Sequence, residues 1–136
     1  MPEGLEAKLA AGAQFIQTQF CMDIDVVRRY TAQLAERGIA AKLFVLIGIV
    51  PLRSAKSARW IREKLHGAII PDAIVDRMER ASDPASEGRR ICLEMVAELA
   101  DIPQVAGCHI MAPGNDDMVP GIITAARDSV SRLAPA

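Results

Sequence analysis

Apolar and polar positions follow two different spacings along the chain, and each spacing predicts a different kind of element. Three segments have the composition of strands: residues 15–20 (FIQTQF), 42–50 (KLFVLIGIV) and 105–112 (VAGCHIMA). The run at 42–50 is almost wholly apolar and rich in β-branched residues, which is typical of a parallel strand buried on both faces. A strand of this kind needs cover on both faces, and the helices of one such chain can cover only one face of the sheet.

Helical spacing fills the segments between these strands. A helix is expected over 24–37, capped by Asp23 or Asp25, because its apolar residues return every three or four positions. Further helices are expected at four other places: after Ser54, after Pro71, from Asp83-Pro84, and after Asp116 or Asp117 with Val119, Ile123, Ala126 and Val130 facing inward.

The order of these elements predicts an α/β fold of parallel βα units joined by right-handed crossovers. The 136 residues are expected to form one domain, 1–136, without an internal repeat. Three strands cannot close a barrel, and the edges of an open parallel sheet need protection. We therefore expect the chain to be half of a barrel or one half of a dimer.

Composition narrows the functions open to the chain. Hydrophobic residues at 51% and charged residues at 24% are typical of a globular protein. Because 16 basic residues nearly balance 17 acidic ones, the chain has no net positive charge to attract nucleic acid or an anionic membrane. The apolar run at 43–52 is too short to span a bilayer, and the first ten residues lack the apolar segment of a secretion signal. Three cysteines without metal-site spacing predict reduced, mostly buried thiols in a cytoplasmic protein and no zinc site.

Chemistry is expected where the strands end, because parallel βα units gather functional side chains at the carboxyl ends of their strands. The sequence has no nucleophile–base pair and no phosphate-binding glycine motif there, so no catalytic residue is assigned. The polar residues at these ends suit a neutral polar ligand: Gln19 and Asp23, then Arg53, Ser54 and Lys56, then His109, Asn115 and Asp116.

The first strand carries an unusual number of side-chain amides. Gln17 and Gln19 share a face with Phe15, and Gln14 is expected to be exposed. A buried amide without a partner costs roughly 1–3 kcal/mol, so these residues need an explanation. From the residues alone, Gln19 is either a ligand-binding amide or an interior amide satisfied by its neighbours, and Gln17 is interpreted as structural.

Four segments together resemble the methylenetetrahydrofolate reductase family. Residues 8–20 (KLAAGAQFIQTQF) resemble the family's K-x-D-A-G-A-D-F-x-x-T-Q stretch, and residues 48–52 (GIVPL) are similar to its G-I-M-P-I strand end. Residues 70–72 (IPD) resemble the I-P-x-W/F turn that comes next, and residues 107–111 (GCHIM) the last strand, G-x-H-F-Y/I-x. All four stand in the family's order and spacing, from about residue 8 to residue 127.

This resemblance implies a (β/α)8 TIM-barrel flavoprotein, of which residues 1–136 would be the C-terminal half. The family reduces 5,10-methylenetetrahydrofolate to 5-methyltetrahydrofolate, a step of one-carbon metabolism and methionine biosynthesis in which FAD relays a hydride from NAD(P)H. The family's general acid and most of its FAD contacts lie upstream of the matched part. The resemblance therefore implies that this chain alone binds FAD poorly.

The resemblance also implies binding residues. Gln19 matches the glutamine that hydrogen-bonds the pterin of the folate, and an amide offers the donor and the acceptor that a pterin edge needs. Lys8 matches a lysine that contacts the FAD phosphates. Lys56 matches a common lysine near the folate, and Asn115 stands where the family has an arginine. His109 matches a family histidine and is interpreted as a core imidazole with a backbone partner.

Two other functions stay open beside the reductase. One is a non-catalytic half-barrel that binds a folate or a partner chain, and the other is a pterin-dependent methyltransferase on the same barrel architecture. The expected partners are a small-molecule folate and either a second copy or the remainder of a longer barrel chain. Neither nucleic acid nor a membrane is expected as a partner.

Overall fold

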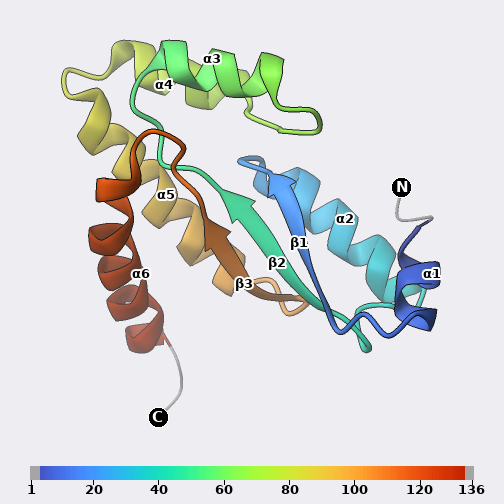
Figure 1. The fold of residues 1–136 in the computed structure, drawn as a ribbon. Coiled ribbons are helices and arrows are strands. Elements are labelled where there is room, and N and C mark those ends of the chain that lie inside the picture. The colour runs from blue at the N-terminus through green and yellow to red at the C-terminus, as the bar shows by residue number, and fades with distance from the viewer. Residues whose placement is uncertain (1–3, 134–136) are drawn as a thin grey trace.

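Three parallel strands form the sheet of this protein. In the computed structural model, which describes residues 4–133, β1 (Phe15–Phe20), β2 (Phe44–Ile49) and β3 (Val105–Ile110) lie in the order β1-β2-β3 (Figure 1). Both neighbouring pairs are parallel. The prediction of an α/β fold with three adjacent parallel strands is confirmed. Residues 1–3 and 134–136 of the predicted domain lie outside the described residues.

The helices between the strands begin where the sequence predicts. They are α2 (Ile24–Glu36), α3 (Ala55–Lys64), α4 (Asp72–Arg80) and α5 (Pro84–Ala100). The carboxylate of Asp23 accepts hydrogen bonds from two backbone N–H groups of α2, and the hydroxyl of Ser54 caps α3 in the same way. A short first helix, α1 (Leu5–Ala10), was not expected, because its six residues bury a single side chain and show no apolar period.

The start of the last helix differs from the prediction. Asp116 and Asp117 do not cap it but lie within a 3-10 turn, η1 (Asp116–Met118), and α6 (Val119–Leu133) follows that turn. A 3-10 turn has fewer residues per turn than an α-helix. The side chains of α6 therefore point in different directions from those of a continuous α-helix that begins at Asp116. The expectation that Ile123 faces inward is therefore wrong: Ile123 is 40% exposed, whereas its neighbour Ile122 is fully buried.

The two faces of the sheet differ in cover. α2 and α5 lie behind the sheet in Figure 1, and Val45, Ile47 and Ile49 of β2 are buried on that side. No helix of residues 4–133 covers the other face, which we call the open face, and there Phe15 is 58% and Phe44 67% exposed. The described chain therefore covers one face of a sheet that needs cover on both, because its single layer of helices reaches one face.

Both outer edges of the sheet carry apolar grooves. At the carboxyl end of β1, Ile69 pairs with the strand: its N–H donates to the carbonyl of Phe20, and its carbonyl accepts from Met22, each at 2.8 Å. A groove of about 750 Å³ runs along β1 beside α1 and α2. A second groove of about 600 Å³ follows β3 between α5 and α6. The described chain therefore leaves apolar surface along each edge of its sheet.

Candidate functional site

A β-bulge interrupts β1 just before its carboxyl end. Residues 15–17 of β1 pair in order with residues 44–46 of β2, and pairing resumes between Phe20 and Gly48. Thr18 and Gln19 therefore stand opposite the single residue Ile47. A bulge of this kind bends a strand and changes the direction of its side chains, and bulges are common beside functional sites.

Side-chain hydrogen bonds hold the bulge in place. The hydroxyl of Thr18 accepts from the backbone N–H of Gly48 at 3.0 Å and lies 2.8 Å from the carbonyl oxygen of Gln19. The carbonyl of Thr18 contacts Nε2 of His109 at 2.8 Å. Since a carbonyl only accepts, this ring nitrogen carries the proton. The backbone partner expected of His109 is confirmed, whereas the residue is half-buried and not part of the buried core.

Gln19 lies at the carboxyl end of β1 with an exposed side chain. Its amide oxygen accepts from the backbone N–H of Phe20 at 2.9 Å, and its amide nitrogen donates to the carbonyl of His66 at 3.3 Å. The amide is thus satisfied by neighbouring backbone, while its surroundings stay open on one side. Gln19 therefore does not carry the energetic cost of an unpaired buried amide. Among the described residues, no buried side-chain nitrogen or oxygen lacks a hydrogen bond.

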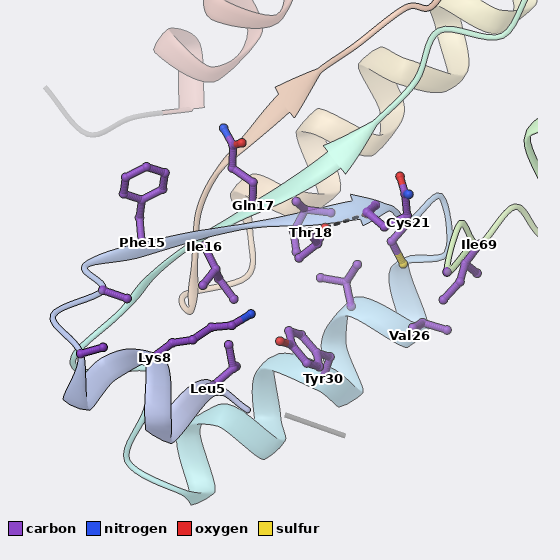
Figure 2. A pocket seen from close by; sticks show the side chains of 16 residues that line it. Leu5, Lys8, Phe15, Ile16, Gln17, Thr18, Cys21, Val26, Tyr30 and Ile69 are labelled. Carbon is purple, nitrogen blue, oxygen red and sulfur yellow. Dashed lines mark hydrogen bonds between the residues drawn. The ribbon is translucent and has the colours of Figure 1, made fainter. Parts of the chain in front are cut away.

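Lys8 and Gln19 line the same groove from different elements. Figure 2 shows Phe15 and Gln17 pointing away from α2, while Lys8 of α1 extends below β1 toward Tyr30. Within the described residues that line this groove, Lys8 is the one cation. The groove therefore offers a single positive charge on the helix side of β1 and amides on the open face.

Lys56 belongs to a different hollow, beyond the end of β2. This hollow measures about 510 Å³ and is bordered by Arg53, Lys56, Trp60 and Pro113. Arg53 donates from its guanidinium to the carbonyl of Gly114 at 2.9 Å, which joins the loop after β2 to the loop after β3. The structure thus brings Lys56 close to the loop that carries Asn115, and both lie apart from the groove of Lys8.

Asn115 is 9% exposed, and its side chain is turned toward the chain itself. Its amide nitrogen donates to the sulfur of Met118, and its backbone N–H donates to the carbonyl of Ala112 at 2.8 Å. It stands at the N-cap position of η1. In this conformation the Asn115 amide organises the turn before α6.

The titratable groups add no reactive centre to this picture. Cys21, Cys92 and Cys108 are free thiols, and burial raises the pKa of each, that of Cys92 to about 12. Such thiols stay protonated near neutral pH, which agrees with the expectation that they pack. Residues 4–133 contain no group of three or more metal-ligating side chains and no helix long and apolar enough to cross a membrane.

Sequence reasoning missed Thr18 as part of the site, and it placed Gly48 at the end of the second strand without its close contacts. A glycine inside an apolar strand is a known sign of a bulge or of close backbone approach, and Gly48 lies in such a run. A Cβ added to Gly48 would come within 2.8 Å of the Thr18 carbonyl oxygen and 2.9 Å of His109 Nε2. The signal was therefore present, but its partners lie in two other strands.

The fold and this site define a parallel α/β protein whose polar side chains gather at the carboxyl ends of its strands. The sequence pattern of the family described as methylenetetrahydrofolate reductase matches residues 3–127. The chain is also similar to the probable methylenetetrahydrofolate reductase (NADPH) of Caenorhabditis elegans, with 28% identity over 123 residues that cover 88% of this chain. The chain belongs to the methylenetetrahydrofolate reductase family. It spans 18% of the length of that relative.

Proposed function

We propose that the chain forms the folate-binding part of a methylenetetrahydrofolate reductase-like oxidoreductase. The reaction would reduce 5,10-methylenetetrahydrofolate to 5-methyltetrahydrofolate, with FAD relaying a hydride from NAD(P)H. The observation that supports this proposal most is the position of Gln19 in a chain that matches the family over residues 3–127. Its amide lies at the carboxyl end of β1, beside an open groove, where it can pair with a pterin edge.

The proposal gives the chain's own residues distinct roles. Gln19 would exchange its contacts with Phe20 and His66 for the donor and acceptor groups of the pterin. Lys56 is exposed on the first turn of α3 and would attract the carboxylates of the folate tail. Asn115 would need to turn away from Met118 to reach the folate.

The described residues fit only part of an FAD molecule. The groove along β1 supplies one cation, Lys8, whereas the pyrophosphate of FAD carries two negative charges. Lys8 also lies on the helix side of β1, away from the face that bears Gln17 (Figure 2). We therefore assign Lys8 a contact with the FAD phosphates in a complete protein and derive no step of the reaction through the flavin.

A complete barrel would explain the uncovered surfaces of the sheet. The edges of β1 and β3 both border apolar grooves, and the open face carries Phe15 and Phe44. In a (β/α)8 barrel each strand has two neighbours, and inward side chains pack in layers. We propose that residues 1–136 contribute the C-terminal strands of such a barrel and that five further strands come from additional polypeptide.

Gln19→Ala tests the folate assignment. In the full-length protein we expect this variant to bind 5-methyltetrahydrofolate about 5- to 150-fold more weakly, since a lost amide pair is worth about 1–3 kcal/mol. Calorimetric titration measures the dissociation constant. Gln14→Ala is the matched control, because Gln14 is an exposed amide just before β1 that does not border the groove. Equal affinities of the two variants would refute the role of Gln19.

Two further readouts separate the reductase from the alternatives. Oxidation of NAD(P)H that depends on 5,10-methylenetetrahydrofolate is expected of the reductase, and loss of flavin in Gln19→Ala is not. Methyl transfer to a thiol without NAD(P)H oxidation would identify a pterin-dependent methyltransferase instead. Folate binding without either reaction in the full-length protein would leave a non-catalytic folate-binding barrel.

A further inference from the structure

The bulge at the end of β1 replaces one hydrogen bond of a regular parallel ladder with another. In an uninterrupted parallel ladder the Thr18 carbonyl would accept from the Gly48 N–H, just as the Gln14 carbonyl accepts from Phe44 N–H at 2.9 Å. The hydroxyl of Thr18 takes that position instead, with the Gly48 N–H at 3.0 Å. The Thr18 carbonyl then needs another donor, because an unpaired carbonyl in a sheet is costly.

His109 supplies this donor from the far strand. Gly48 pairs with His109 in the sheet, and the imidazole crosses above Gly48 to reach the Thr18 carbonyl at 2.8 Å. The crossing is possible because Gly48 has no Cβ, which would lie 2.9 Å from Nε2. One residue from each strand therefore takes part in the bulge. Gly48 donates to the Thr18 hydroxyl, and His109 donates to the Thr18 carbonyl.

We infer that His109 is a positioning residue, which holds the bulge of β1 and thereby aims the amide of Gln19 at the folate. The inference rests on the proposed function of Gln19. Removing the bulge would shift the strand by one residue, and such a shift turns a side chain to the opposite face of a sheet. Gln19 would then lose its contacts with Phe20 N–H and the His66 carbonyl.

The test compares His109→Ala with His109→Gln in the full-length protein. Glutamine retains an N–H donor at the end of its side chain, and alanine does not. His66→Ala is the matched control, since His66 is the other histidine of the chain, its side chain is exposed, and only its backbone carbonyl contacts Gln19. Thermal denaturation checks folding. Should His109→Ala not fold, His109→Met replaces it, because methionine fills the space without a donor.

Two measurements read the position of Gln19. The first is the NMR signal of the Gln19 side-chain amide, which Gln19→Ala identifies by its absence. We expect this signal to move or broaden in His109→Ala and to keep its position in His109→Gln and His66→Ala. The second is the dissociation constant of 5-methyltetrahydrofolate, which we expect to rise about tenfold in His109→Ala, with His109→Gln restoring most of the affinity.

A double variant decides whether His109 acts through Gln19. We expect His109→Ala to weaken folate binding no further in a Gln19→Ala background, because the group that His109 positions is then absent. Independent, multiplicative losses would overturn the inference, and so would an unmoved Gln19 amide signal in His109→Ala. Failure of the wild-type protein to bind any folate would instead refute the proposed function, while the amide signal would still decide the positioning role.

Discussion

Gly88 of α5 packs directly against the backbone of Leu52, and a Cβ on Gly88 would overlap the Leu52 carbonyl oxygen. Leu52 is fully buried and follows the end of β2, so the close approach seats α5 beneath the carboxyl end of the sheet. A glycine inside a helix ordinarily weakens it by about 0.5–1 kcal/mol relative to alanine. Close packing against the chain explains why this helix has a glycine there.

Gly88→Ala is therefore expected to destabilise the protein, by about 3 kcal/mol, because a methyl group cannot fit without moving α5 away from Leu52. Urea denaturation followed by circular dichroism measures the free energy of unfolding. Gly121→Ala in α6 is the matched control: nothing lies within 4 Å of its added Cβ, so alanine should stabilise by about 0.5–1 kcal/mol. If both variants changed the free energy of unfolding in the same direction, the packing argument would be contradicted.

A second pair of glycines makes the same comparison within the sheet. Gly48→Ala would place a Cβ within 2.9 Å of Thr18 and His109 atoms, whereas the Cβ of Gly107→Ala would meet only Leu46 at 3.4 Å. We expect Gly48→Ala to lower the free energy of unfolding by about 1–3 kcal/mol through overpacking, and Gly107→Ala to change it by less than about 1 kcal/mol. Chemical denaturation of both variants tests this ranking, and a more disruptive Gly107→Ala would reverse it.

The strands and the helix starts could be predicted from the sequence alone. The strands at 15–20 and 44–49 were recognisable because their composition differs from the helical spacing around them, and their parallel order follows from the alternation of strands and helices. Helix starts at Asp23 and Ser54 were recognisable because capping is a local interaction within three residues. Local patterns thus fixed the elements and their order.

The site depends on contacts between residues far apart in the chain. The bulge at Thr18 exists because of Gly48, 30 residues later, and His109, 91 residues later. No local pattern around Thr18 specifies either partner. The same holds for Gly88 and Leu52, whose contact arises only when α5 docks on the sheet. The predicted site residues Gln19, Lys8, Lys56 and Asn115 remain predictions, since their placement shows their neighbours and not their ligands.

The buried thiol of Cys92 predicts how stability depends on pH. Burial raises its pKa in the folded protein to about 12, above the ordinary value of 9.0. Between these two values the unfolded chain loses the proton while the folded chain keeps it, so stability falls as pH rises above about 9. Below pH 9 both states are protonated and Cys92 contributes no pH dependence.

Cys92→Ala isolates this contribution. We expect the urea midpoint of the wild-type protein to fall between pH 9 and pH 11 more steeply than that of Cys92→Ala, even though the variant starts from a lower stability because of the lost packing. The comparison removes the effect of groups that titrate independently of Cys92. If the urea midpoints of both proteins fell equally steeply with pH, the pKa of Cys92 would be the same in the folded and unfolded states.

The open surfaces of the sheet predict that residues 1–136 by themselves associate in solution. Two apolar grooves along the sheet edges and an uncovered face with Phe15 and Phe44 expose apolar surface that a second copy can cover. Light scattering should give a mass above 14.7 kDa that rises with concentration. A concentration-independent monomer would contradict this expectation.

Charged substitutions locate the surface that associates. Phe44→Lys places a charge on the open face, and Ile123→Lys places one in the groove beside β3, so both should shift the chain toward the monomer. Trp60→Lys is the control, because Trp60 is 54% exposed but lies on α3, away from both sheet edges. If Trp60→Lys dissociates the assembly as well as Phe44→Lys does, association proceeds through α3 and not through the open sheet.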